Sequence, residues 1–203
     1  MINILFCLVA YLLGGVPFGL LLGRAVGVDV RNSGSGNIGA TNVNRLLGRR
    51  LGLLTLGCDV LKGYLPVLAA FLWLPESSSR EFFVALCGLA AVVGHMFPVY
   101  LRFQGGKGVA TAVGVFLFFA PLAVLISLFI FAASVGLSGF VSVGSLLASG
   151  LIPLWICLVA EPSPAMLLLA LAVVALIWFQ HRANIVRLLR GEEKSWRKKE
   201  SQA

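Results

Sequence analysis

Three short polar segments carry residues that could bind or transfer a charged group. The first runs from Gly34 to Arg45 and spells G-x-G-x-x-G at its start. Glycines let successive backbone N–H groups converge on an anion, and the guanidinium of Arg45 matches a phosphate with two parallel hydrogen bonds. A turn-rich loop without a ligand is the alternative. We favour a phosphate site, whose further donors would be Ser35, Gly36, Asn37, Thr41 and Asn42.

The second segment is Gly105-Gly106-Lys107-Gly108, which directly precedes an apolar stretch. It is not a Walker A loop, because the spacing and the following Ser or Thr are absent. Backbone N–H groups at a helix N-terminus, with a lysine among glycines, can nevertheless bind an anion. The alternative is a turn that carries one lysine at the membrane surface.

The third segment, from His181 to Glu193, follows the last apolar stretch. If it is helical, His181 and Asn184 share one face, and so do Arg187 and Arg190. Arginines after a final span usually reflect only the topology. A histidine and an asparagine one turn apart could in addition bind or deprotonate a substrate hydroxyl.

Two further ionisable residues, Asp59 and Lys62, lie inside an apolar stretch and are neighbours on one helical face. Charges at such depth indicate function, but a pair that only neutralises itself is equally compatible with the sequence. His95, near the end of the next apolar stretch, could be a packed residue or a site residue. The cysteines are scattered singly and the histidines are not clustered, so neither a metal site nor a cofactor is predicted.

The amino-acid composition indicates the environment of these polar segments. The chain of 203 residues is 59% hydrophobic and 12% charged, with a mean hydropathy of +0.98, whereas about 25% of the residues of a soluble domain are charged. A membrane protein is therefore predicted. The net charge of +8 does not indicate nucleic acid, because the basic residues interrupt apolar spans instead of forming a soluble basic surface.

The distribution of basic residues orients the chain. All but Lys62 and Arg80, 14 of the 16, fall in the loop after the first span, in the loop around Lys107, or in the tail. By the positive-inside rule these three regions are cytoplasmic and the N-terminus is outside. The apolar stretches are Ile2–Gly23, Leu51–Leu74, Phe82–Leu101, Gly108–Ala160 and Ala165–Gln180. The first lacks a basic n-region and a cleavage site, so it is predicted to be a span.

This topology requires an odd number of spans, and hence an even number between Gly108 and Gln180. Four are favoured, because Pro121, the Gly136–Gly139 region and the Glu161–Pro164 turn offer three breaks. We predict an all-α integral membrane bundle of about seven transmembrane helices, with five spans as the alternative. It would form one transmembrane domain over residues 1–203 with a basic cytoplasmic tail from about 181.

The glycine pattern at Gly34 does not predict a dinucleotide fold, because no strand precedes it.

The segments GSGNIGATNVNR, DVLKG, GHMFPVYLRFQGGKGVAT and HRANIVRLLRGEE, taken together and in this order, resemble the bacterial acyl-phosphate-dependent glycerol-3-phosphate acyltransferases, the PlsY family. The resemblance covers nearly the whole chain. It implies transfer of a fatty acyl group from acyl phosphate to the sn-1 hydroxyl of glycerol 3-phosphate, which gives lysophosphatidic acid and phosphate. It also implies phospholipid synthesis at the bacterial inner membrane, with the active site on the cytoplasmic face and no cofactor.

The resemblance also assigns residues. The essential serine and arginine of the family's first motif correspond to Ser35 and Arg45, and its histidine and asparagine correspond to His181 and Asn184. The glutamate important for the family's structure corresponds to Glu193. The family's glycine-rich motif, associated with a substrate phosphate, corresponds to Gly105, Gly106, Lys107 and Gly108.

Two rival functions remain at this point. Acyltransferases that use acyl-CoA or acyl carrier protein have Asp five residues after a His, where this chain has Tyr100 after His95 and Val186 after His181. A transporter of phosphate esters would place its substrate near the bilayer midplane, where only Asp59 and Lys62 lie. The base for the acyl transfer is open between His181 and the acyl phosphate itself, and we favour the substrate.

Overall fold

The computed structural model describes residues 2–196, and these form α-helices and short 3-10 turns without any β-strand. The predicted all-α fold is therefore confirmed. Of the predicted basic tail, Arg197, Lys198 and Lys199 lie outside the described residues. The α-helices are α1 Ile2–Gly15, α2 Phe18–Ala25, α3 Ala40–Leu47, α4 Arg49–Trp73, α5 Arg80–Met96, α6 Val109–Phe119, α7 Pro121–Ser138, α8 Val141–Val159, α9 Pro164–Gln180 and α10 Arg182–Leu189; the 3-10 turns are η1 Val30–Asn32 and η2 Val99–Leu101.

The lengths of these helices fit a multi-pass membrane protein. In residues 2–196, five helical segments are long and apolar enough to cross a membrane, with α1 and α2 counted together. A sixth span is added if α9 and α10, which are bent by 56° relative to each other, form one broken span. Separately, α6 is a shorter apolar helix. The number of spans and their orientation stay predictions.

The breaks predicted between Gly108 and Gln180 are confirmed, since four helices, α6 to α9, occupy this stretch. Pro121 begins α7, where its missing N–H costs no hydrogen bond. Gly139 ends α7 with a left-handed φ of 79°, a conformation that glycine adopts without steric cost. The hydroxyl of Ser163 accepts a hydrogen bond from the N–H of Met166 at 3.2 Å and caps α9.

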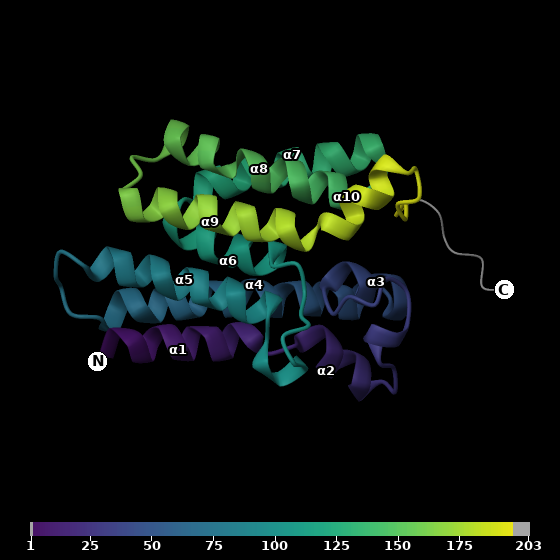
Figure 1. Cartoon of the computed structure of the whole chain (residues 1–203), viewed down its shortest axis with the longest axis horizontal. Helices are drawn as coiled ribbons and strands as arrows, with labels where there is room; N and C mark the ends of the chain where they lie inside the picture. Colours follow the sequence, from purple (N-terminus) through teal and green to yellow (C-terminus); the bar gives the residue numbers. More distant parts are fainter. Residues whose placement is uncertain (1, 197–203) are drawn as a thin grey trace.

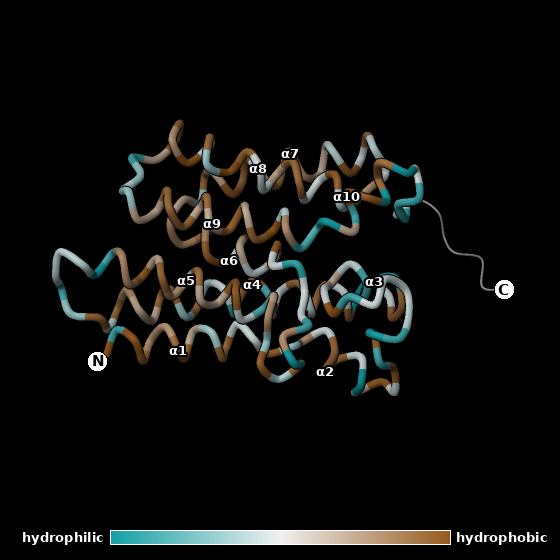
Figure 2. Tube along the Cα trace, in the orientation of Figure 1, coloured by the Kyte–Doolittle hydropathy of each residue, from teal (hydrophilic) through white to brown (hydrophobic). Residues whose placement is uncertain are grey.

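The helices run lengthwise, so that polar loops collect at the two ends of the molecule (Figure 1). The start of α1 and the connection from α4 to α5 lie at one end, whereas α2, α3 and α10 lie at the other. Hydrophobic residues dominate the helices and hydrophilic residues gather in the loops (Figure 2). Large apolar side chains such as Phe129 of α7, 73% exposed, point outward, as expected for contact with lipid. We call the end that carries α3 and α10 the polar rim.

The first predicted span is interrupted within the structure. Residues 16 and 17 separate α1 from α2, because Pro17 lacks the N–H that would continue the helical ladder. The second piece, α2, lies against the first glycine-rich loop, residues 33–39: a Cβ placed on Gly19 would lie 1.9 Å from the carbonyl oxygen of Ile38. Only glycine permits this backbone contact.

The last residues of α5 join several elements near the polar rim. The carbonyl of Met96 accepts hydrogen bonds from the N–H of Gly105 at 3.1 Å and from Nε2 of Gln180 at 3.3 Å. The hydroxyl of Tyr11 donates to the carbonyl of Phe97 at 2.7 Å. The carboxyl end of α5 thus connects α1, α9 and the second glycine-rich loop, Gly105–Gly108.

Candidate functional site

The first glycine-rich loop, residues 33–39, is organised by the buried amide of Asn42. Its Nδ2 donates to the carbonyls of Val30 and Asn37, both at 2.9 Å, and of Ser33 at 3.3 Å. Its Oδ1 accepts from the N–H of Ser35 at 2.8 Å. We expected Asn42 to donate to a phosphate, but these contacts occupy both ends of the amide. Its side chain therefore holds the loop, because a buried amide is most stable when fully hydrogen-bonded.

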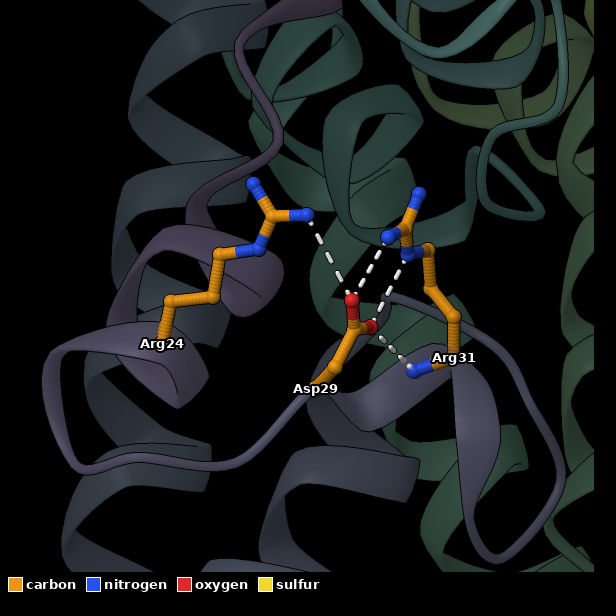
Figure 3. A network of polar contacts seen from close by, with 3 residues as sticks. All are labelled: Arg24, Asp29 and Arg31. Atoms are coloured by element: carbon orange, nitrogen blue, oxygen red, sulfur yellow. Dashed lines mark hydrogen bonds and ion pairs between the residues drawn. The ribbon is translucent and has the colours of Figure 1, made fainter.

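The start of the same loop is fixed by an ionic network at η1 (Figure 3). The carboxylate of Asp29 accepts from the backbone N–H, Nε and Nη2 of Arg31 at 3.1, 2.9 and 2.5 Å. Nη2 of Arg24 lies 3.4 Å from the same carboxylate. The hydrogen bonds from Arg31 hold the pKa of Asp29 well below its usual value. Arg24 and Arg31 are thereby partly neutralised.

The remaining candidates of the first motif lie on this loop and on α3. Gly39 precedes α3 without a side-chain cap, so the first N–H groups of this helix lack intrahelical partners, as at any helix N-terminus. Ser35 and Thr41 are exposed, and Oδ1 of Asn37 accepts from the N–H of Gly39 at 2.8 Å. Within residues 2–196, Arg45 makes no ion pair with a carboxylate. Its positive charge is available to a ligand.

The second glycine-rich loop, Gly105–Gly108, folds back on α5. The N–H of Gly106 donates to the carbonyl of His95 at 3.0 Å, and Gly108 enters α6 with a φ of +81°. Lys107 has no carboxylate within ion-pair distance in the described chain. Burial lowers the pKa of Lys107 to about 8, an effect that Glu193 opposes and that Arg187 and Arg45 reinforce.

The third motif is built around Glu193. Its Oε1 accepts from Nδ2 of Asn184 at 2.6 Å and from Oγ of Ser142 at 2.8 Å, and its Oε2 accepts from Nε of Arg187 at 2.8 Å. Burial would raise the pKa of this carboxyl, but the three hydrogen bonds outweigh it and keep the pKa below its usual value. The predicted position of Asn184 on a helix one turn from His181 is confirmed by α10.

His181 is buried at the junction of α9 and α10. Its Nδ1 lies 2.8 Å from the carbonyl oxygen of Ile177. Because a carbonyl can only accept, Nδ1 carries the proton in the neutral ring, and Nε2 is left with a lone pair.

The structure brings the three motifs into electrostatic contact. The charge of Lys107 interacts with those of Arg45, Arg187 and Glu193, and it also acts on the ring of His181. Nζ of Lys194 lies 3.4 Å from the carbonyl oxygen of Gly34, so the segment after α10 reaches the first loop. Basic groups from all three segments therefore lie near one another at the polar rim.

Sequence reasoning missed Ser142, which supports Glu193 from α8. A signal was present, because Ser142, Ser145 and Ser149 recur at intervals of three and four residues in a stretch without charges. This spacing places hydroxyl groups on one helical face. What the spacing could not show is that the face of Ser142 meets the tail.

An apolar cavity begins beside the polar rim. Val109, which directly follows Gly108, and Ile177, whose carbonyl holds His181, both line it. Its walls come from α6, α7, α8 and α9, and include Ala112, Phe116, Phe131, Ala148, Ile152 and Val173. The lining of this cavity is almost entirely apolar, which is the chemistry that a hydrocarbon chain prefers.

Comparison with known proteins gives one consistent result. The family described as glycerol-3-phosphate acyltransferase matches residues 4–191. A glycerol-3-phosphate acyltransferase of Desulfotalea psychrophila is 60% identical over 197 residues, covering 97% of this chain and all of the relative. One from Geotalea daltonii is 51% identical over 185 residues, covering 91% of this chain and 92% of the relative.

Two solved structures are similar over nearly their whole length. Both are crystal structures of PlsY, an integral membrane glycerol 3-phosphate acyltransferase. The glycerol 3-phosphate form has a TM-score of 0.89 and 39% identity, covering 97% of this chain and 96% of that one. The lysophosphatidic acid form has a TM-score of 0.85 and 38% identity, covering 96% and 95%.

Proposed function

Given that this chain belongs to the glycerol-3-phosphate acyltransferase family, we propose that it uses acyl phosphate as donor and acylates the sn-1 hydroxyl of glycerol 3-phosphate. The products would be lysophosphatidic acid and phosphate. One observation carries this proposal: two cations without ion-pair partners in residues 2–196, Arg45 and Lys107, interact at the rim, directly beside an apolar cavity. Both substrates carry a phosphate, and the donor also carries an acyl chain.

In the proposed site, phosphate groups are bound by the two glycine-rich loops. Arg45 and Ser35 act from the first loop, and Lys107 acts from the second together with the N–H groups that begin α6. The site would lie on the cytoplasmic face of the bacterial inner membrane, where the basic loops are expected. The acyl chain extends from the rim into the cavity that begins at Val109.

The proposed reaction needs no covalent enzyme intermediate. The hydroxyl oxygen attacks the acyl carbonyl carbon, and the bond from that carbon to the phosphate oxygen breaks. The hydroxyl proton passes to an oxygen of the departing phosphate, so no separate base is consumed. The protein contributes alignment of the two substrates and positive charge near the leaving group.

In this mechanism His181 orients the hydroxyl. With Nδ1 donating to the carbonyl of Ile177, Nε2 can accept a hydrogen bond from glycerol 3-phosphate. His181→Gln should then raise the KM for glycerol 3-phosphate about tenfold and leave kcat within about threefold. A fall in kcat of about a hundredfold or more would instead assign proton abstraction to His181.

The donor is tested with purified protein, labelled glycerol 3-phosphate, and either acyl phosphate or acyl-CoA. Product from acyl phosphate alone supports the proposal, whereas product from acyl-CoA alone contradicts it. Analysis of the product for the position of the acyl group tests the assignment of the sn-1 hydroxyl. Arg45→Ala, which removes a cation from the proposed site, should abolish most of the signal.

A further inference from the structure

The helical bundle buries a polar cluster, an ion pair with a neighbouring histidine, that the proposed reaction does not use. Nζ of Lys62 lies 2.8 Å from Oδ1 of Asp59, and Nδ1 of His95 lies 3.7 Å from the same oxygen. All three residues are buried, at 2 to 6% exposure. Burying an ion pair gives little net stability on average, and ionisable residues within a membrane bundle usually serve a function. The contacts of this cluster with its surroundings indicate what that function is.

Lys62 connects the cluster to the first glycine-rich loop. Its Nζ donates to the carbonyl of Val16 at 2.8 Å, in the break between α1 and α2, and lies 5.7 Å from the ring centroid of Phe18 at the start of α2. One residue later, Gly19 contacts the carbonyl of Ile38 in the loop so closely that no side chain fits between them. Lys62 therefore fixes the helix on which this loop rests.

His95 connects the same cluster to the second loop. Its carbonyl accepts the hydrogen bond from Gly106 at 3.0 Å. A Cβ on Gly106 would lie 2.1 Å from Nε2 of the His95 ring. The ring that faces Asp59 on one edge thus faces the loop on the other, directly beside Lys107.

We infer that Asp59, Lys62 and His95 are positioning residues that set the placement of the two phosphate-binding loops relative to each other. Asp59 is their shared centre, because both Lys62 and His95 approach its Oδ1. A pair that only neutralised itself would need neither the hydrogen bond from Lys62 to the break before α2 nor the approach of His95, which contacts the second loop. This inference rests on the proposed role of the loops in binding phosphate.

The first test separates positioning from stability. Lys62→Met leaves the carboxylate of Asp59 buried without its cation and should lower the Tm strongly. The double variant Asp59→Asn with Lys62→Met buries no charge of this pair and should reverse most of the decrease in Tm caused by Lys62→Met alone. Its KM for glycerol 3-phosphate should nevertheless stay about tenfold above wild type, with kcat within about threefold. A double variant with wild-type KM would overturn the inference.

The second test uses the contact between Gly106 and His95. Gly106→Ala should raise the KM about tenfold or more, because the new methyl group displaces the loop from the ring. Adding His95→Ala makes room for the methyl group. The KM of this double variant should therefore be at least about threefold lower than that of Gly106→Ala, although His95→Ala alone raises the KM. Gly57→Ala on α4, where a Cβ meets nothing within 4 Å, is the control and should match wild type. Purely additive effects would contradict the proposed contact.

Direct binding of glycerol 3-phosphate, measured by titration calorimetry, distinguishes the two proposals. If Lys107→Ala weakens binding about tenfold but the Asp59→Asn, Lys62→Met protein binds like wild type, only the positioning role fails. If Lys107→Ala and Arg45→Ala both bind like wild type, the loops do not bind phosphate and both proposals fail. The inference is supported when the loop variants and the neutral double variant all weaken binding.

Discussion

The two glycine-rich loops lie at the same rim and carry similar residues, but they are held in place differently. The first loop is folded around its own sequence: the amide of Asn42 bonds Val30, Ser33, Ser35 and Asn37 within 12 residues. The second loop has no such internal amide. It is held by the end of α5, through the backbone of His95 and Met96. A local side chain determines the first loop, whereas a neighbouring helix determines the second.

The strongest disruption of the first loop is expected from Asn42→Leu. The substitution removes four hydrogen bonds, each of which contributes about 1 kcal/mol, and leaves buried carbonyls unpaired. We expect kcat/KM to fall by about a hundredfold or more, with little change in the helical content seen by circular dichroism. Asn44→Ala, an exposed position on the same helix, should retain wild-type kcat/KM. Near-normal activity of Asn42→Leu would mean that the loop does not depend on this amide.

A smaller effect is expected at Arg45. Lysine keeps the charge but cannot form two parallel hydrogen bonds with a phosphate. Arg45→Lys should therefore raise the KM for glycerol 3-phosphate by roughly thirtyfold, or about 2 kcal/mol. Arg50→Lys, at the exposed start of α4, serves as the matched control. If both variants have the wild-type KM, a bidentate contact by Arg45 is ruled out.

The dependence of the first loop on Asn42 can also be tested without changing Asn42, by substituting a glycine that contacts it. Gly34 has a φ of +63°, and a Cβ there would lie 2.3 Å from Oδ1 of Asn42, whereas Gly27 has a φ of +80° and nothing within 4 Å. Both alanine variants incur the same backbone strain, about 1 kcal/mol. Only Gly34→Ala should lower kcat/KM, by about tenfold. Equal effects of the two would show that backbone strain, and not Asn42, is responsible.

The smallest effect concerns pH and the second loop. Because the pKa of Lys107 is lowered to about 8, its positive charge is lost as the pH rises through that value. The KM for glycerol 3-phosphate should therefore rise about threefold between about pH 7 and about pH 8.5. Arginine remains charged over this range, so the increase should be absent in Lys107→Arg. An equal increase in both proteins would assign the pH dependence to another group.

Much of the fold follows from the sequence because its causes are local. A high apolar content determines that the solvent is lipid, and residues such as Pro121 and Gly139 determine where helices begin and end. The three polar motifs also stand out in the sequence because they interrupt apolar spans, although basic residues beside spans are equally expected from the topology. Their role in binding substrate stays a prediction. The interruption at Pro17 was missed, although proline within a helix is a local signal.

Other features depend on residues far apart in the chain, and only the tertiary structure decided them. The sequence places Asp59 next to Lys62 but cannot show that His95 lies beside them or that Lys62 reaches Val16. It gives Glu193 a basic neighbourhood but not the contact with Ser142, 51 residues away. The role of Asn42 also changed, although its contacts are local, because the spacing does not show which backbone groups a side chain bonds. Composition and spacing determine which groups are available, whereas packing determines which of them are already hydrogen-bonded and which can bind a substrate.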